Sequence, residues 1–104
     1  MPEIIRRGDV VWGSMSPTVG YEQGGHRPHL VLSDEALHRT RNIAIVVPLT
    51  TTNRAWPTRV KLPDGSYAIG EQPITMSLNR ITKVEHKGYD TRPVVNVINN
   101  PISS

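Results

Sequence analysis

Three residues near the ends of predicted strands have side chains that can act on a phosphate group. Arg27 closes a stretch rich in glycine, and its planar guanidinium can hold two phosphate oxygens at once. Thr50 follows a buried apolar run, where its hydroxyl can donate a hydrogen bond. His26 can carry a proton near neutral pH. Taken alone, the same residues also fit an arginine in a surface salt bridge, a threonine bonded to its own backbone and a packed histidine.

Composition excludes several other chemistries. The chain has no cysteine, which excludes disulfides and thiol catalysis. Its four histidines are scattered without the spacing of a metal site, so we predict no metal and no cofactor. The net charge of +3 favours an acidic partner. Because no apolar run is long enough for a signal peptide or a membrane span, we expect a cytoplasmic protein without a membrane partner.

The pattern of apolar residues predicts a small domain built mainly from strands. The 104 residues fit a single domain, 1–104. There is no phenylalanine, and nine prolines and eight glycines indicate many turns, so the core must come from valine, isoleucine and leucine, which favour strands. Short strands separated by turn signals are typical of a small barrel or sandwich. We predict strands over residues 8–12, 28–32, 43–49, 58–62, 66–70 and 81–86.

The remaining segments are predicted as loops, a turn and two short helices. Residues 14–25 contain too many glycines and prolines for a regular element, and residues 63–66 (PDGS) form a strong turn signal. Residues 33–37 start with a capping residue followed by helix formers. Residues 90–100 are predicted as a helix because Pro93 suits a helix N-terminus, although their β-branched residues would also fit a strand.

Several motifs, in this order along the chain, resemble the MazF/PemK toxin family. Residues 7–12 (RGDVVW) resemble the family's opening strand, and residues 16–28, ending in GHRP, resemble its first loop. Residues 29–34 match its second strand, and residues 47–51 (VPLTT) match its P-[IVL]-T motif. Glu71-Gln72, followed by Thr75 and Arg80, resemble its [DE]-Q-x-x-T segment.

The resemblance implies a mainly β (β-rich α+β) fold, an SH3-like barrel of strongly curved antiparallel strands with a short helix and a short C-terminal helix. It implies the toxin of a type II toxin–antitoxin system. That toxin would be a sequence-specific, metal-independent endoribonuclease that cuts single-stranded mRNA and leaves a 2′,3′-cyclic phosphate and a 5′-hydroxyl. It also implies a homodimer and a MazE-like antitoxin with an acidic tail.

Carried onto this sequence, the resemblance assigns catalysis to Arg27, Thr50 and Glu22, with Glu22 as the base or as an orienting group. Thr51 takes the place of Thr50 if the register shifts by one residue. Aromatic rings in or beside loops can stack on unpaired bases. The predicted RNA-binding residues are Tyr21, Gln23, His26, Thr51, Arg54, Trp56, Glu71 and Gln72.

The sequence departs from the family pattern at three places. Ile74 stands where many members carry arginine, Ser77 stands where many carry aspartate, and the tail after Gly88 is short. These departures keep open a non-catalytic member that only binds RNA or a partner. A gyrase poison of the CcdB type also stays open, because it shares the implied fold.

Overall fold

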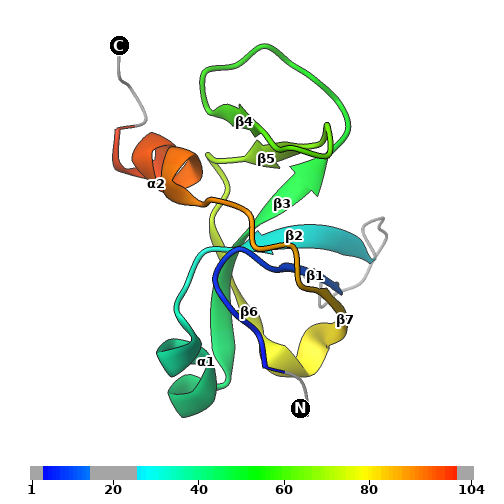
Figure 1. The fold of residues 1–104 in the computed structure, drawn as a ribbon, viewed down its shortest axis with the longest axis vertical. Helices are drawn as coiled ribbons and strands as arrows, with labels where there is room; N and C mark the ends of the chain where they lie inside the picture. The colour runs from blue at the N-terminus through cyan, green and yellow to red at the C-terminus, as the bar shows by residue number, and fades with distance from the viewer. Residues whose placement is uncertain (1–3, 15–25, 101–104) are drawn as a thin grey trace.

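The computed structural model describes residues 4–14 and 26–100, in which seven strands and two α-helices alternate with short connections (Figure 1). In chain order, the elements are β1 (Val10–Gly13), β2 (Arg27–Val31), α1 (Glu35–Arg41), β3 (Ile43–Thr50), β4 (Arg59–Lys61), β5 (Tyr67–Ile69), β6 (Ile74–Ser77), a 3-10 turn (Leu78–Arg80), β7 (Ile81–Glu85) and α2 (Arg92–Asn99).

The long central strand β3 holds the sheet together because it changes partners along its length. The strand order is β4-β5-β3-β2-β1-β7, with β6 paired to β3, and every pairing is antiparallel. Val46 pairs with both β2 and β6, whereas Leu49 and Thr50 pair with β5. One strand therefore joins the β4–β5 hairpin, at the top of Figure 1, to the other strands.

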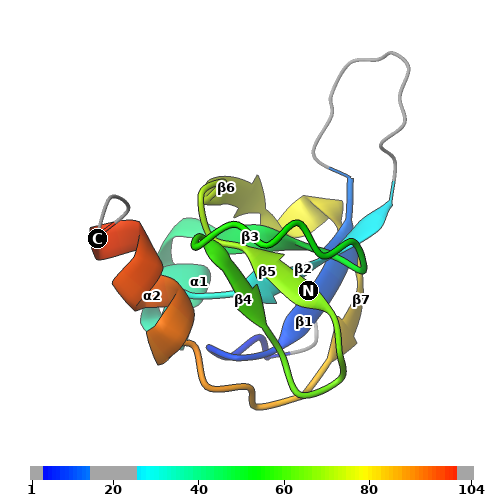
Figure 2. The same ribbon diagram turned by 90° about the horizontal axis from the view of Figure 1, so that it is seen from above.

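Both faces of the sheet are buried, which explains the continuous apolar runs of the central strands. Successive side chains of a strand point to opposite faces, and neighbours such as Val46 and Val47 enter separate clusters. The first cluster includes Val94 of α2 together with Leu62 and Ala68 near the β4–β5 hairpin. Accordingly, α2 flanks that end of the sheet in both views (Figures 1 and 2).

Local chemistry fixes the ends of both helices. The Asp34 side chain accepts a hydrogen bond from the Ala36 backbone N–H (3.0 Å), and α1 ends at Asn42 in the left-handed conformation (φ 59°). In α2, Pro93 lies in the first turn, where its missing N–H costs no helical hydrogen bond. The Asp90 side chain accepts from the Arg92 backbone N–H (3.0 Å).

The structure confirms the predicted β-rich antiparallel fold with a short helix and a C-terminal helix. The six predicted strands are present with ends shifted by one or two residues, and α1 runs to Arg41 rather than ending near residue 37. Strand β6 was not predicted, although Ile74 and Met76 alternate there with polar residues, the pattern of a half-buried strand. Within residues 4–14 and 26–100 no pairing joins β4 to β7, so closure into a barrel stays a prediction. None of the helices in these ranges is long and apolar enough to cross a bilayer.

Protonation of His29 should weaken the fold in mild acid. This β2 residue is 1% exposed, and burial, helped by the charge of Arg27, lowers its pKa from 6.5 to about 4. The unfolded chain therefore binds a proton more readily than the native chain, and stability falls as the pH drops below about 6.5. Between pH 7 and pH 5 the loss should be on the order of 1–2 kcal/mol.

Urea unfolding of the wild type and of His29→Gln at both pH values measures this contribution. Glutamine does not titrate in this range, so the variant should lose less stability between pH 7 and pH 5 than the wild type does. An equal loss in the two proteins would show that His29 is not the sensitive group.

Candidate active site

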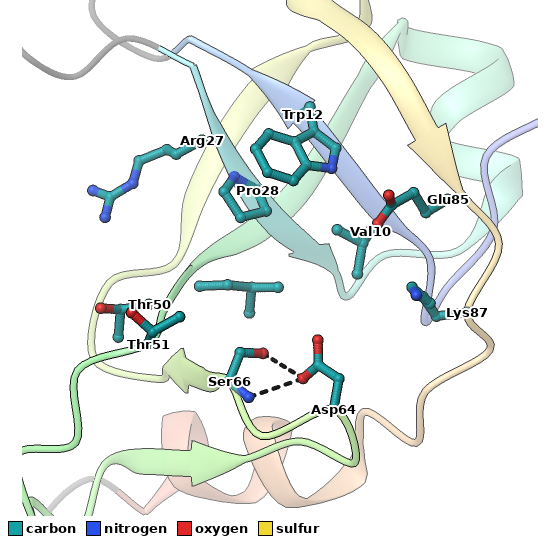
Figure 3. A pocket seen from close by; sticks show the side chains of 11 residues that line it. Val10, Trp12, Arg27, Pro28, Thr50, Thr51, Asp64, Ser66, Glu85 and Lys87 are labelled. Atoms are coloured by element: carbon teal, nitrogen blue, oxygen red, sulfur yellow. Dashed lines mark hydrogen bonds between the residues drawn. The ribbon is translucent and has the colours of Figure 1, made fainter.

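A cleft of about 420 Å³ opens over the face of the sheet formed by β1, β2 and the end of β3 (Figure 3). Arg27 lies at one end with Thr50 and Thr51 nearby, and an apolar floor that includes Val10 and Pro28 separates Arg27 from a second polar group at Asp64. The cleft is lined by Val10, Trp12, Arg27, Pro28, Leu49, Thr50, Thr51, Asp64, Ser66, Glu85 and Lys87.

The pairing of β2 with β3 brings Arg27 and Thr50 together. The two strands are antiparallel, with His29 opposite Pro48. Extending that register by two residues sets Arg27, the first residue of β2, across from Thr50, the last residue of β3. Neighbouring strands lie about 4.8 Å apart, so the two side chains reach the same end of the cleft although 22 residues separate them in the sequence.

The hydrogen bonding of Thr50 leaves its hydroxyl proton available. The Thr50 Oγ1 atom accepts a hydrogen bond from the Thr52 backbone N–H (3.1 Å). This is the backbone contact expected of a threonine that closes a strand. A hydroxyl has one donor and two acceptor sites, so the contact orients Thr50 and leaves its O–H free to donate into the cleft.

The guanidinium of Arg27 is not neutralised by any carboxylate in the described part of the chain. Arg27 is exposed, and no ion pair or hydrogen bond joins its side chain to residues 4–14 or 26–100. An anion bound in the cleft would therefore meet a cation with five free N–H donors.

The opposite end of the cleft is built by the turn between β4 and β5. The Asp64 Oδ1 atom accepts hydrogen bonds from the backbone N–H (2.9 Å) and the hydroxyl (2.7 Å) of Ser66. These two donors, aided by the charge of Lys87, hold the pKa of Asp64 below its ordinary value. The side chain of Glu85, on β7, forms an ion pair with Lys83 (3.3 Å).

Three of the predicted RNA-binding residues gather around Arg59 instead of lining the cleft. The Arg59 guanidinium lies 5.0 Å from the centroid of the Trp56 ring, and Arg54 lies 5.9 Å from the same centroid. Arg59 also pairs with Glu71 (3.7 Å) and donates to the Thr52 carbonyl (3.5 Å). Because Thr52 also bonds to Thr50, this Arg59 cluster is linked to the cleft through the backbone.

The other predicted residues are distributed differently. The His26 ring lies outside the cleft lining, with its Nε2 atom 3.1 Å from the Thr82 hydroxyl. Gln72 is exposed, and its backbone N–H bonds to the Ile69 carbonyl (3.0 Å). Tyr21, Glu22 and Gln23 lie outside the described residues.

The side chains at the second polar end of the cleft are not among the predicted site residues, and neither is Trp12, which packs against the first apolar cluster and also lines the cleft. Residues 63–66 were recognised only as a turn, and a turn signal does not reveal which side chains face a cleft. Lys87 carried no signal at all. In the described ranges, no three histidine, aspartate or glutamate side chains gather in a way that could hold a metal ion.

The comparison with protein families identifies the class of this chain. The family described as "PemK-like, MazF-like toxin of type II toxin-antitoxin system" matches residues 6–102. The chain therefore belongs to this family.

Individual relatives agree with that assignment. The endoribonuclease EndoA of Bacillus subtilis is 36% identical over 93 residues, which cover 80% of each chain. The endoribonuclease toxin MazF of Escherichia coli K12 is 40% identical over 55 residues, which cover 53% of this chain and 50% of the relative. The match thus spans about half the length of the E. coli protein.

Solved structures show the same fold. A MazF crystal structure from Deinococcus radiodurans has a TM-score of 0.77, with 22% identity over 98% of this chain and 99% of that one. A mycobacterial endoribonuclease in complex with its cognate antitoxin has a TM-score of 0.65 and 28% identity, covering 90% of this chain and 86% of that one.

The Arg59 cluster should fix the loop between β3 and β4. Arg59→Met removes the ion pair with Glu71 and the hydrogen bond to the Thr52 carbonyl, so the loop should open more often. Tryptic cleavage after Arg54 should then accelerate by about fivefold or more, because proteolysis follows the population of the open form. Arg39→Met, which removes only an exposed helical ion pair, is the matched control. Equal cleavage rates in the two variants would mean that Arg59 does not hold the loop.

Proposed function

We propose that this chain, as a single domain over residues 1–104, is the toxin of a type II toxin–antitoxin system and acts as a metal-independent endoribonuclease on single-stranded mRNA. The observation that carries the proposal is the meeting of Arg27 and Thr50 at one end of a single cleft. The names of the relatives from B. subtilis and E. coli, both endoribonucleases, support it.

The reaction follows from the chemistry of the two side chains. The 2′-hydroxyl of the RNA loses its proton to a base and attacks the adjacent phosphorus, while the bond from phosphorus to the 5′-oxygen breaks and that oxygen takes up a proton. The products are a 2′,3′-cyclic phosphate and a 5′-hydroxyl. DNA has no 2′-hydroxyl and cannot react in this way.

Arg27 and Thr50 stabilise the charge that develops on the phosphate. The Arg27 fork can bind two non-bridging oxygens, and the Thr50 hydroxyl donates one more hydrogen bond. Neither group needs to give up a partner from the described residues first. We assign the base to Glu22, five residues before Arg27 in the sequence, with His26 as the alternative proton carrier.

Two further features of the surface suit binding partners, one an unpaired RNA base and the other an antitoxin. Exposed Trp56 (49%) beside Arg54 and Arg59 offers a stacking platform for an unpaired base. The charge of Arg27, which meets no carboxylate among the described residues, suits the acidic tail of a MazE-like antitoxin, which would fill the cleft and block RNA. The mycobacterial relative is seen with its cognate antitoxin. We further propose a cytoplasmic homodimer.

Replacing Arg27 should remove cleavage without unfolding the protein, because the side chain is exposed. Incubated with a long RNA in EDTA, the wild type should give discrete fragments with 5′-hydroxyl ends. Arg27→Ala should be slower by roughly 10²–10³-fold, the usual loss of an oxyanion-stabilising donor. Arg27→Lys should recover only part of the rate, since lysine lacks the planar fork.

Arg39→Ala is the control, because it removes an arginine from the exposed face of α1. Cutting by Arg27→Ala at the wild-type rate would remove Arg27 from the mechanism. Intact RNA with the wild-type protein would favour a non-catalytic binder if the RNA still shifts on a gel. Stalled gyrase complexes would instead favour a gyrase poison.

Variants at positions 50 and 51 test which hydroxyl acts on the phosphate. Thr50→Ser keeps the hydroxyl and should cut within about tenfold of the wild type, whereas Thr50→Val should lose roughly 10² in rate. Thr51→Val should cut almost normally. The reverse order of effects would transfer the role to Thr51 and contradict the assignment of Thr50.

A further inference from the structure

The cleft has different chemistry at its two ends. At the Arg27 end a cation and a neutral hydroxyl suit a phosphate group, while the other end carries the carboxylates of Asp64 and Glu85 together with the ammonium group of Lys87 (Figure 3). Because RNA is a polyanion, a fixed negative charge in its binding cleft opposes binding unless it meets a hydrogen-bond donor. In a nucleotide, the donors are found on the ribose and on the edge of the base.

The turn fixes both the orientation and the charge of Asp64. Ser66 supplies two donors to the Oδ1 atom, at 2.9 and 2.7 Å. The Oδ2 atom has no partner in the described part of the chain and points up from the turn into the cleft (Figure 3). The lowered pKa keeps the group ionised at neutral pH. The cleft therefore presents one oriented acceptor that is never a donor.

The surface between the two ends suits the flat body of a base. The side chains of Val10 and Pro28 lie between the Arg27 end and the Asp64 turn, and Leu49 also lines the cleft. Apolar surface of this kind packs against the face of any base and leaves the base edge to be read by polar groups. A volume of about 420 Å³ lies in the range of small-ligand sites.

We propose that Asp64 reads one base beside the scissile phosphate by accepting a hydrogen bond from its exocyclic amino group. This inference rests on the proposed ribonuclease function and names one determinant of its cutting sequence. Adenine, cytosine and guanine carry such an amino group. Uracil has no exocyclic amino group. Its two carbonyl oxygens flank its only free ring N–H, and the Asp64 carboxylate would repel them.

The orientation of Asp64 leads to a specific result for Asp64→Asn. The two Ser66 donors require an acceptor, so the asparagine carbonyl oxygen should occupy the Oδ1 position. The amide nitrogen then replaces Oδ2 and turns the acceptor into a donor. The preferred base at this position should therefore change from one with an amino group to one with a carbonyl group at the same edge.

The base preference is tested with a random pool of single-stranded RNA. The pool is cut in EDTA, and the new ends are sequenced. Next to the cut, the wild type should show one position at which uracil is depleted by roughly tenfold, the order expected for one base contact. Asp64→Asn should favour uracil over cytosine at that position and keep its other preferences. Two control variants should keep the wild-type base preferences. Glu85→Gln removes one negative charge from the same cleft, and Glu35→Gln removes one from α1.

A second measurement uses the wild type alone. In matched oligonucleotides that differ only at this position, replacing cytosine by uracil, or adenine by hypoxanthine, should slow cutting by about tenfold. This result supports the inference even if Asp64→Asn proves too unstable to use.

The two proposals fail in different ways. Two results would overturn the role of Asp64 and leave the ribonuclease intact. In one, the wild type cuts RNA but no position discriminates against uracil. In the other, Asp64→Asn shows the same base preferences as the wild type. Absence of cutting by the wild type would overturn the ribonuclease itself, and the base contact with it.

Discussion

The antiparallel register between β2 and β3 is the constraint on which the site depends. Backbone hydrogen bonds set His29 opposite Pro48, and the same register continues toward Arg27 and Thr50 at the end of the strand pair. A slip of one residue would turn every side chain of a strand to the other face. Because both faces of this sheet are buried in apolar clusters, such a slip would disrupt two cores at once. The packing of both clusters, the first of which reaches the cleft at Val10 and Leu49, thus fixes the geometry of the site.

The site is also prepared for an anion before one binds. Thr50 is oriented by the Thr52 backbone, and Arg27 has no counter-charge among the described residues. By contrast, Arg59 is 9% exposed at its side chain and engaged with Glu71 and Trp56. Among the described residues, Arg59 is therefore held by contacts with a loop, whereas the Arg27 side chain has no partner.

The sequence predicted the strands well because alternation and turn residues report on local structure. It does not predict β6, in which Ile74 and Ser77 stand out only as departures from the family pattern and Thr75 only as part of a family motif. The types of Arg27 and Thr50 indicated phosphate chemistry, but only the family resemblance indicated that they meet, since convergence depends on long-range pairing. The separation of Arg54, Trp56 and Glu71 from the cleft depends on contacts with the Trp56 ring and with Arg59, which no local pattern encodes. The importance of Asp64 depends equally on the position of a turn relative to β1 and β7.

A double-mutant cycle on Arg27 and Thr50 tests most directly whether the two side chains act on one phosphate. The rate constant kcat/KM would be measured in EDTA for the wild type, Arg27→Lys, Thr50→Ser and the double variant. When two groups act together on a single transition state, the effects of replacing them on the activation free energy are strongly non-additive. The account predicts that the double variant loses clearly less than the product of the two single losses. Losses that multiply would show that the two residues act independently and would contradict a shared phosphate site.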